Sequence, residues 1–268
     1  MKNEMNENST NRGNIKISGS GSTSGGIYDE VKISGSGEVN GDLECSEMKT
    51  SGSSKVNGNV KAINVSTSGF SKIMGDLETE FVKTSGSCEV SGNVKAKELR
   101  SSGTTKINGD LSSDTVHISG SVNVGGNIRA EEMSISGSSV IGGDCETENF
   151  KASGGFTIGG LLNSGSIEIS AHGSCKVKEI GGENITVKRG KGDLFGFELL
   201  FKTLFSGHGG LNTDIIEGDQ IYLENTTAKV VRGNNVFIGE GCDIDVVEYK
   251  GKLDLVAGGK VKEQKKIE

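Results

Sequence analysis

The chain has 268 residues, of which 43 are glycine and none is proline or tryptophan, and its net charge is −7. Hydrophobic residues make up only 32% and aromatic residues 4%, a composition that is unusual for a globular enzyme and that favours a repeat architecture. The acidic balance, without a dominant basic patch, speaks against nucleic acid as a partner.

Residues 1–14 are polar, and we predict a disordered N-terminal tail. This stretch lacks the apolar core of a secretory signal, and no run of about 18 apolar residues, the length of a membrane-spanning helix, occurs in the chain. We therefore expect a cytoplasmic protein. The five cysteines show no C-x-x-C spacing, so we expect reduced, buried thiols in place of disulfides or metal ligands. They are Cys45, Cys88, Cys145, Cys175 and Cys242.

A repeated sequence motif covers residues 15–166. A unit of 16 residues begins at Ile15, and eight units of 17 residues follow it. Their first residues are Val31, Met48, Val65, Val82, Leu99, Val116, Met133 and Phe150. All eight units carry Ser-Gly at the fourth and fifth positions and glycine at the eleventh. A period this strict is typical of a solenoid.

Within a unit, apolar or small residues alternate with polar ones, as Val31 and Ile33 alternate with Lys32 and Ser34. A period of two predicts strands with one buried face, whereas several glycines per unit would weaken a helix. We predict an all-β fold, a single-stranded parallel β-helix with one unit and three strands per turn. Glycine would lie at corners that need positive φ or a close backbone approach. The Asp and Asn beside it tolerate left-handed geometry and bond to their own backbone.

Charge alternates from turn to turn at two outward positions. The twelfth position reads Asp42, Asn59, Asp76, Asn93, Asp110, Asn127 and Asp144, and the fourteenth reads Glu44, Lys61, Glu78, Lys95, Ser112, Arg129 and Glu146. Equivalent positions stack at roughly 4.8 Å, so alternation avoids repulsion between like charges. We expect it to fix the register between turns.

Two inward columns are predicted to form a thin core. They are Val39, Val56, Ile73, Val90, Ile107, Val124, Ile141 and Ile158, and Leu43, Val60, Leu77, Val94, Leu111, Ile128, Cys145 and Leu162. We predict a regular β-helix over residues 15–183 and an irregular continuation over 184–259, with about 13 turns in all. Residues 260–268 are predicted to be a charged tail.

A hydrophobic insert at 190–212 interrupts the irregular part. Asp193 resembles a helix N-cap, Gly207 resembles a stop signal, and the apolar residues between them recur at helical spacing. We predict a short amphipathic helix over 194–205. Its candidate membrane or partner contacts are Leu194, Phe195, Phe197, Leu200, Phe201, Leu204 and Phe205. Three interpretations stay open: packing on the rod, an interfacial membrane anchor and a protein–protein contact.

The repeated phrases resemble those of the bactofilins, the polymer-forming bacterial cytoskeletal proteins. Such phrases are Ser34-Gly35 with Gly41-Asp42, and Ser51-Gly52 with Gly58-Asn59. The resemblance covers residues 15–166 well and the rest loosely. It implies a right-handed β-helix that polymerises end to end without nucleotide, associates with membrane, and supports cell shape, motility or the localisation of envelope proteins. The chain is longer than a minimal bactofilin core, and its hydrophobic segment is internal where the family's is N-terminal.

No motif suggests catalysis, a cofactor or a metal site. The three histidines, His117, His172 and His208, are far apart in sequence. The aspartates of the twelfth position lie two turns apart, roughly 9.6 Å, which is too far for two carboxylates to share one cation. We therefore expect a protein that is not an enzyme.

The leading hypothesis is a self-assembling scaffold. Its expected partners are further copies of itself, the inner face of the cell membrane, and envelope or motility proteins. The alternative is a non-polymerising β-solenoid binding module, recruited to a membrane or partner through residues 194–205. A carbohydrate-acting β-helix enzyme would need a groove of carboxylates, and an ice-binding solenoid would need outward threonine columns. Neither pattern is present, since Thr50, Thr67 and Thr84 fall at an inward position.

Overall fold

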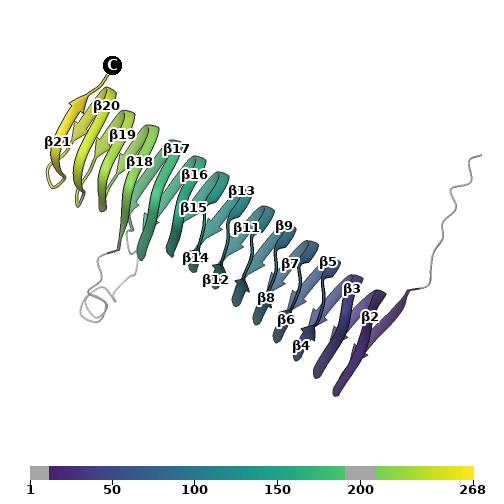
Figure 1. Ribbon diagram of the computed structural model, residues 1–268. Coiled ribbons are helices and arrows are strands. Elements are labelled where there is room, and N and C mark those ends of the chain that lie inside the picture. The colour runs from purple at the N-terminus through teal and green to yellow at the C-terminus, as the bar shows by residue number, and fades with distance from the viewer. Residues whose placement is uncertain (1–11, 191–208) are drawn as a thin grey trace, which may run out of the picture.

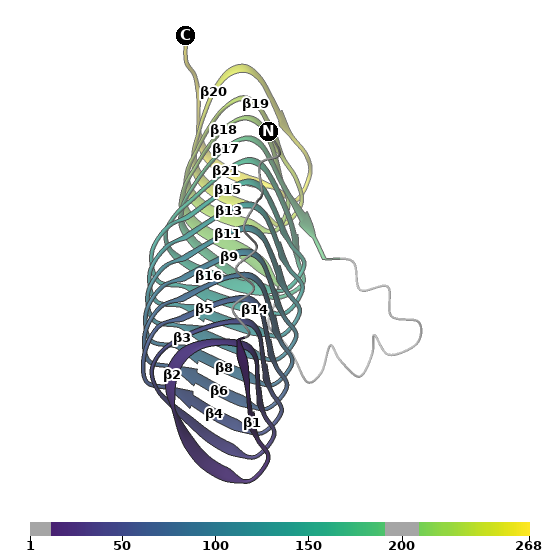
Figure 2. The same cartoon turned by 90° about the vertical axis from the view of Figure 1, so that its right-hand side faces the viewer.

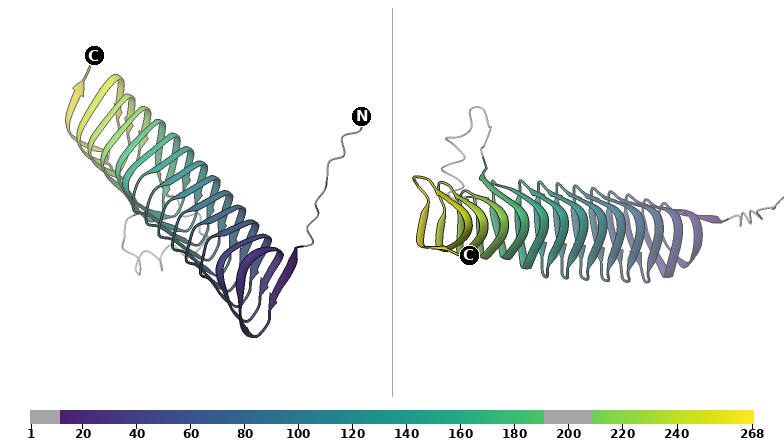
Figure 3. Two further views of the ribbon diagram at one scale, coloured as in Figure 1. Left: turned by 45° about the vertical axis from the view of Figure 1, so that its right-hand side comes forward. Right: turned by 90° about the horizontal axis from the view of Figure 1, so that it is seen from above.

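The chain forms one elongated rod, in which complete turns of a β-helix stack on one another. The computed structural model describes residues 12–190 and 209–268. The N-terminal turns lie at one end of the rod and the C-terminal turns at the other (Figure 1), and successive turns superpose as flattened loops when the rod is turned (Figure 2). The stacking continues along the whole rod (Figure 3). The predicted parallel β-helix is confirmed, with about 14 turns where the sequence predicted about 13.

A short and a long strand alternate in the regular turns. The short strands are β4 (Ser53–Val56), β6 (Phe70–Ile73), β8 (Ser87–Val90), β10 (Thr104–Ile107), β12 (Ser121–Val124) and β14 (Ser138–Ile141). The long strands are β5 (Val60–Thr67), β7 (Leu77–Thr84), β9 (Val94–Ser101), β11 (Leu111–Ile118), β13 (Ile128–Ile135) and β15 (Cys145–Ala152).

The remaining strands build the turns toward the two ends. The first three are β1 (Gly13–Ile17), β2 (Ser20–Ile33) and β3 (Ser36–Thr50). The last six are β16 (Gly155–Ala171), β17 (Ser174–Arg189), β18 (Gly210–Leu223), β19 (Thr226–Ile238), β20 (Asp243–Leu255) and β21 (Lys260–Lys266).

Parallel pairing between turns arranges equivalent positions in columns along the rod. We number each column by its position in the 17-residue unit, so that Val31 lies in column 1 and Lys32 in column 2. Column 1 runs without a break from Ile15 to Leu253. A side chain therefore has its closest neighbours in other turns and not along its own strand.

The core consists of the apolar inward columns. The two predicted ones, columns 9 and 13, are buried, as are column 1 from Ile15 to Val236 and the three threonines that were expected to face inward. Leu253, the last residue of column 1, is half-buried. Some inward hydroxyls bond to one another, for example Ser54 Oγ to Ser71 Oγ at 2.9 Å. All five cysteines are buried and free, as predicted. Burial raises the pKa of the Cys88 thiol to about 11 and that of Cys145 to about 12.

The prediction of three strands per turn was wrong in one respect. Each long strand covers two faces without a break, and its ladder skips one residue in the middle. In β11, Ser113 and Thr115 pair with the neighbouring turns, whereas Asp114 between them does not. The buried residues on either side of this skip, Ser113 and Val116, are three apart. The third corner is thus a bend inside a strand, and it needs no glycine.

Close approach, and not positive φ, explains the regular corner glycines. A Cβ on Gly103 would lie 2.0 Å from the carbonyl oxygen of Gly86 and 2.5 Å from that of Ser85, one turn below. Glycines with positive φ are few in the described ranges: Gly26, Gly41, Gly241 and Gly258. At the Ser-Gly corner the backbones of successive turns touch, so only glycine fits.

The Gly-Asp and Gly-Asn motifs are also explained by the close approach of successive turns. Asp76 Oδ1 accepts a hydrogen bond from the backbone N–H of Asn93 at 2.7 Å, and Asn93 Oδ1 accepts one from the N–H of Asp110 at 2.9 Å. A Cβ on Gly92 would lie 2.1 Å from Asp76 Oδ1. Each carboxylate or amide oxygen thus bonds the next turn across its glycine, where the sequence predicted a bond to its own backbone.

Replacing Gly103 by alanine is expected to destabilise the rod, because the new methyl group meets backbone carbonyls that cannot rotate away. Overpacking of this kind costs about 1–3 kcal/mol. The control is Ser102→Ala, an exposed change at the same corner that should stay within about 0.5 kcal/mol. Denaturant unfolding measures both variants. Equal losses for the two would contradict the close-approach explanation.

Replacing Asp110 by alanine removes the acceptor for the backbone N–H of Asn127, which it bonds at 2.7 Å. We expect a loss of about 1 kcal/mol in the free energy of unfolding. Asp110→Asn keeps the oxygen and should remain within about 0.5 kcal/mol of the parent chain. If the asparagine variant lost as much as the alanine variant, the charge and not the oxygen would be what stabilises the corner.

Candidate assembly surfaces

The N-terminal end of the rod is an open sheet edge. β1 pairs only with β2, and the first residues of β2 pair only with β3. The outer backbone groups of this edge therefore have no neighbouring strand in the part of the chain that the structure describes. Ile15 is buried and Ile17 half-buried, and residues 18–26 consist of serine, glycine and threonine without any charge. This end presents an uncharged segment, residues 18–26, beside β1, which carries the two isoleucines and the exposed Lys16.

The C-terminal end is an open edge of different chemistry. Within residues 12–190 and 209–268, residues 253–255 of β20 pair only with β19, and β21 pairs only with β20. Leu255 is 42% exposed and Val256 39%. The lysines of β21 are Lys260, Lys262, Lys265 and Lys266. Residues 260–266, which the sequence analysis placed in a charged tail, are thus an edge strand. Lysines on such a strand hinder pairing with a like edge.

Column 2 changes its charge along the rod. From the N-terminal end it reads Lys16, Lys32, Lys49, Ser66, Lys83, Arg100, His117, Ser134, Lys151, Glu168, Thr186, Tyr222, Phe237 and Asp254. Some of its cations are paired, as Lys49 is with Glu47 at 2.7 Å and Lys151 with Glu168 at 3.5 Å. The column is basic toward the N-terminus and ends in an acid, a gradient that the alternation rule does not predict.

Column 14 alternates as the sequence indicated. Lys61 lies 3.7 Å from Glu78, and Arg129 lies 3.1 Å from Glu146. Alternation returns in the irregular turns, where Arg232 pairs with the glutamates one turn below and one turn above, Glu217 and Glu248. These pairs are exposed, so each contributes less than about 1 kcal/mol. Their role in setting the register stays a prediction.

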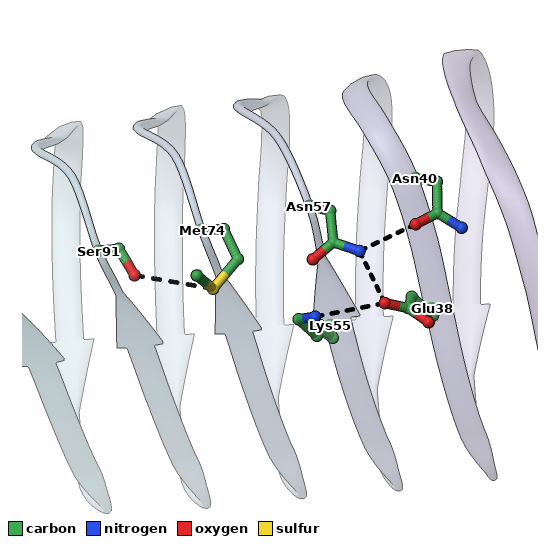
Figure 4. Close-up of polar contacts among 6 residues, drawn as sticks. All are labelled: Glu38, Asn40, Lys55, Asn57, Met74 and Ser91. Atoms are coloured by element: carbon green, nitrogen blue, oxygen red, sulfur yellow. Dashed lines mark hydrogen bonds and ion pairs between the residues drawn. The ribbon is translucent and has the colours of Figure 1, made fainter.

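Polar side chains also link turns on the face of the short strands (Figure 4). Glu38 accepts a hydrogen bond from Asn57 Nδ2 at 2.7 Å and lies 3.3 Å from Lys55 Nζ. Asn57 also donates to Asn40 Oδ1 at 2.9 Å. One turn beyond Asn57, the exposed Met74 takes the place of asparagine in this column and is contacted by Ser91. The asparagine bonds are therefore confined to the first turns.

The predicted contact segment 194–205 lies in the range 191–208, outside the described residues, and so does the predicted helix. The ranges that are described contain no helix, and hence none that could span a membrane. His117 lies in column 2, His172 Nδ1 lies 3.2 Å from the carbonyl oxygen of Ser170, and His208 falls within the same undescribed range. Among the residues that are described, no group of His, Cys, Asp and Glu is arranged to hold a metal ion.

The edge residues were missed by the sequence reasoning. Leu255 reads as one more apolar residue of an alternating strand, and β21 reads as a polar tail. Only the pairing between turns shows that both lie at the end of the sheet. The signal that could have found them is the column register, because Ile15 and Leu253 occupy the same position of the repeat at the two ends.

Comparison with known families and proteins supports the resemblance read from the repeats. Residues 82–163 match the Bactofilin family model, which is described as polymer-forming cytoskeletal. The uncharacterized protein YhbF of Bacillus subtilis (strain 168) is 42% identical over 97 residues, covering 36% of this chain and 37% of that protein. The uncharacterized protein YhbE of the same organism is 42% identical over 85 residues, covering 32% and 33%. The chain spans about a third of the length of these relatives. No solved structure matches it significantly.

Proposed function

We propose that this chain, in which residues 82–163 match the polymer-forming bactofilin family, is a non-enzymatic cytoskeletal scaffold that assembles end to end into filaments. The observation that carries the proposal is the pair of open edges at the ends of one rod. Unpaired N–H and C=O groups on an edge strand are a template for a strand of another molecule. A rod with such an edge at each end can add copies at both.

Assembly of this kind needs no bound nucleotide. The contacts that join two copies are the same as those that join two turns, namely backbone hydrogen bonds and apolar contacts between equivalent columns. In a solenoid each repeat contacts only its neighbours, so a further copy adds a joint without altering the turns already present. The free energy of the joint therefore comes from the chain itself.

We also propose that the filament lies in the cytoplasm, at the inner face of the cell membrane, where it supports cell shape, motility or the localisation of envelope proteins. The support is the sequence of residues 194–205, in which phenylalanine and leucine recur at helical spacing. An amphipathic segment of this composition favours a membrane surface. Its flanking residues, Gly190 and Gly209, lie next to the corner at His172, on the outside of the rod.

A second candidate function is a non-polymerising binding module, recruited through the same segment. The observation that favours it is the lysine-rich edge strand β21, since lysines on an edge strand are a device against strand addition. In that case the C-terminal edge would be closed to other copies, and the rod would act as a spacer that presents the segment to a membrane or a protein.

The scaffold proposal predicts filaments of purified full-length chain in the absence of nucleotide. Negative-stain electron microscopy over a range of protein and salt concentrations should show threads one rod wide, and their length should increase with protein concentration. Monodisperse single rods under every condition would overturn the scaffold and leave the binding module.

The membrane proposal predicts that Phe197, Phe201 and Leu204 together bind a bilayer. Changing all three to serine should lower cosedimentation with anionic lipid vesicles at least fivefold, while filaments in the absence of lipid persist. The matched control changes Glu198 and Lys202 to glutamine in the same segment and should bind as the parent does. Unchanged cosedimentation of the serine variant would remove the anchor role.

A further inference from the structure

We propose that a groove on the side of the rod binds a linear polyamine, an organic cation that carries several ammonium groups along one chain. The groove is formed by columns 14, 15 and 16 between β11 and β17. The site needs only a single rod, so the inference does not depend on the proposed function. Three features carry it: the shape of the groove, a run of acids along one wall, and a buried hydroxyl on the floor that has no partner.

The groove follows the bend of the long strands along the middle of the rod (Figure 1). Its volume is about 750 Å³, within the range of small-molecule sites. Small residues of column 15 form the floor: Ser113, Ala130, Thr147, Ser164 and Gly182. Columns 14 and 16 form the walls. A floor without large side chains offers no pocket for the aromatic anchors of a protein partner, and it leaves room for a narrow, flexible chain.

Column 16 breaks the alternation of charge that the other outward columns show. From β7 onward it reads Glu80, Lys97, Asp114, Glu131, Glu148, Gly165, Glu183 and Asp219. Its cation, Lys97, pairs with Glu80 at 3.2 Å, and only acids and one glycine follow it. Like charges on neighbouring turns are destabilising. A local rule that is broken without compensation in the fold is expected at a functional site.

The acids that line the groove lack a cation of their own. Within residues 12–190 and 209–268, Glu131, Glu148 and Glu183 form no ion pair. On the opposite wall, Arg129 is already paired with Glu146 at 3.1 Å. No group of His, Cys, Asp and Glu in the same ranges is arranged to hold a metal ion. The charge of this wall therefore calls for a cation that extends along it and not for one that is chelated at a point.

The floor supplies the second, independent observation. Hydroxyls of column 15 bond to backbone carbonyls at the bend, as Ser164 Oγ does to the carbonyl oxygens of Glu148 and Ser166, both at 3.0 Å. Ser113 bonds in the same way. Thr147 lines the groove and is only 6% exposed, yet its Oγ1 has no hydrogen-bond partner in the described part of the chain. A buried polar group without a partner calls for an explanation such as a bound ion. An ammonium group has three donors, enough for this hydroxyl and the carboxylates beside it.

The spacing of the carboxylates favours a linear polyamine over a single ammonium. Glu131 and Glu148 are one turn apart, roughly 4.8 Å, and Glu148 and Glu183 are two turns apart, roughly 9.6 Å. Between the last two, Gly165 has no side chain, and a Cβ there would lie 3.8 Å from Glu148 Oε2. The methylene chain of a polyamine can cross the wall at this glycine while its ammonium groups stay at the acids on either side.

Isothermal titration calorimetry of the full-length chain with spermine tests the site. We expect saturable binding at low salt that weakens as salt is added, because salt screens exposed charges. Changing Glu131 and Glu148 together to glutamine should lower the affinity at least about tenfold, since hydrogen bonds to charged groups are the stronger ones. The matched control changes Glu132 and Glu240 to glutamine. Both are exposed and outside the groove, so this variant loses the same charge and should bind as the parent does.

Four outcomes would overturn the site. Equal losses of affinity in the two double variants would mean that spermine follows the net charge alone. Displacement of spermine by an equal concentration of Mg²⁺ would mean that a simple counterion suffices. Binding of an oligolysine peptide without binding of spermine would assign the groove to a basic protein segment. Absence of any spermine binding at low salt would also contradict the proposal. None of these results bears on whether the chain forms filaments.

The orphan hydroxyl gives a second measurement. Thr147→Val removes a hydroxyl that has no partner in the rod, so the variant should unfold at the temperature of the parent or above it, yet bind spermine more weakly. The matched control is Thr79→Val in the same column, whose hydroxyl bonds to the carbonyl oxygen of Ile63 at 3.0 Å. It should lower the unfolding temperature and leave the spermine affinity unchanged. Unchanged spermine affinity of Thr147→Val would overturn the placement of an ammonium group at this hydroxyl.

Discussion

The structure depends on one constraint: each turn must lie at strand-pairing distance from the next along its whole circuit. On the flat faces this spacing is satisfied by ordinary parallel pairing. At the corners it leaves no room for a side chain, as the 2.0 Å approach of a Cβ on Gly103 to the carbonyl of Gly86 shows. The corner at column 12 meets the constraint differently, because the oxygen of Asp76 supplies the partner that the N–H of Asn93 would otherwise lack. The repeated Ser-Gly, Gly-Asp and Gly-Asn motifs are thus the residues that this spacing requires at the corners.

Since neighbours belong to different turns, like side chains of the described residues form columns along the rod. A column places similar side chains one above another at a fixed spacing, which suits long surfaces and ends. The buried thiols illustrate the same logic. Cys88 and Cys145 fill inward positions where other turns have serine, threonine or an aliphatic residue, and burial raises the pKa of each far above the range in which a thiolate attacks. They serve as packing residues.

Much of this arrangement could be predicted from the sequence, because the period fixes which residues share a column. The buried columns 9 and 13, the inward threonines and the buried cysteines all follow from it. The bend at Asp114 does not, since alternation cannot show where a strand turns without glycine. The hydrogen bond that Asp76 accepts from the N–H of Asn93 could not be predicted either. The Gly-Asp motif is local, so it suggested a bond to the local backbone and not to the next turn. β21 was missed because its lysine-rich sequence does not suggest a strand, and only its pairing with β20 shows that it is one. The contact segment 194–205 lies outside the described residues and stays a prediction.

The irregular turns change the side-chain chemistry of two columns. The bonds of column 12 stop at Leu161, whose N–H still bonds to Asp144 Oδ1 at 2.8 Å but whose side chain has no oxygen to offer the next turn. Column 2 turns from basic to acidic at Glu168, a few residues beyond it. A rod of identical turns would carry the same charge at both ends. Because the later turns depart from the repeat, column 2 begins with Lys16 and ends with Asp254. Loss of regularity along the rod thus gives its two ends different chemistry.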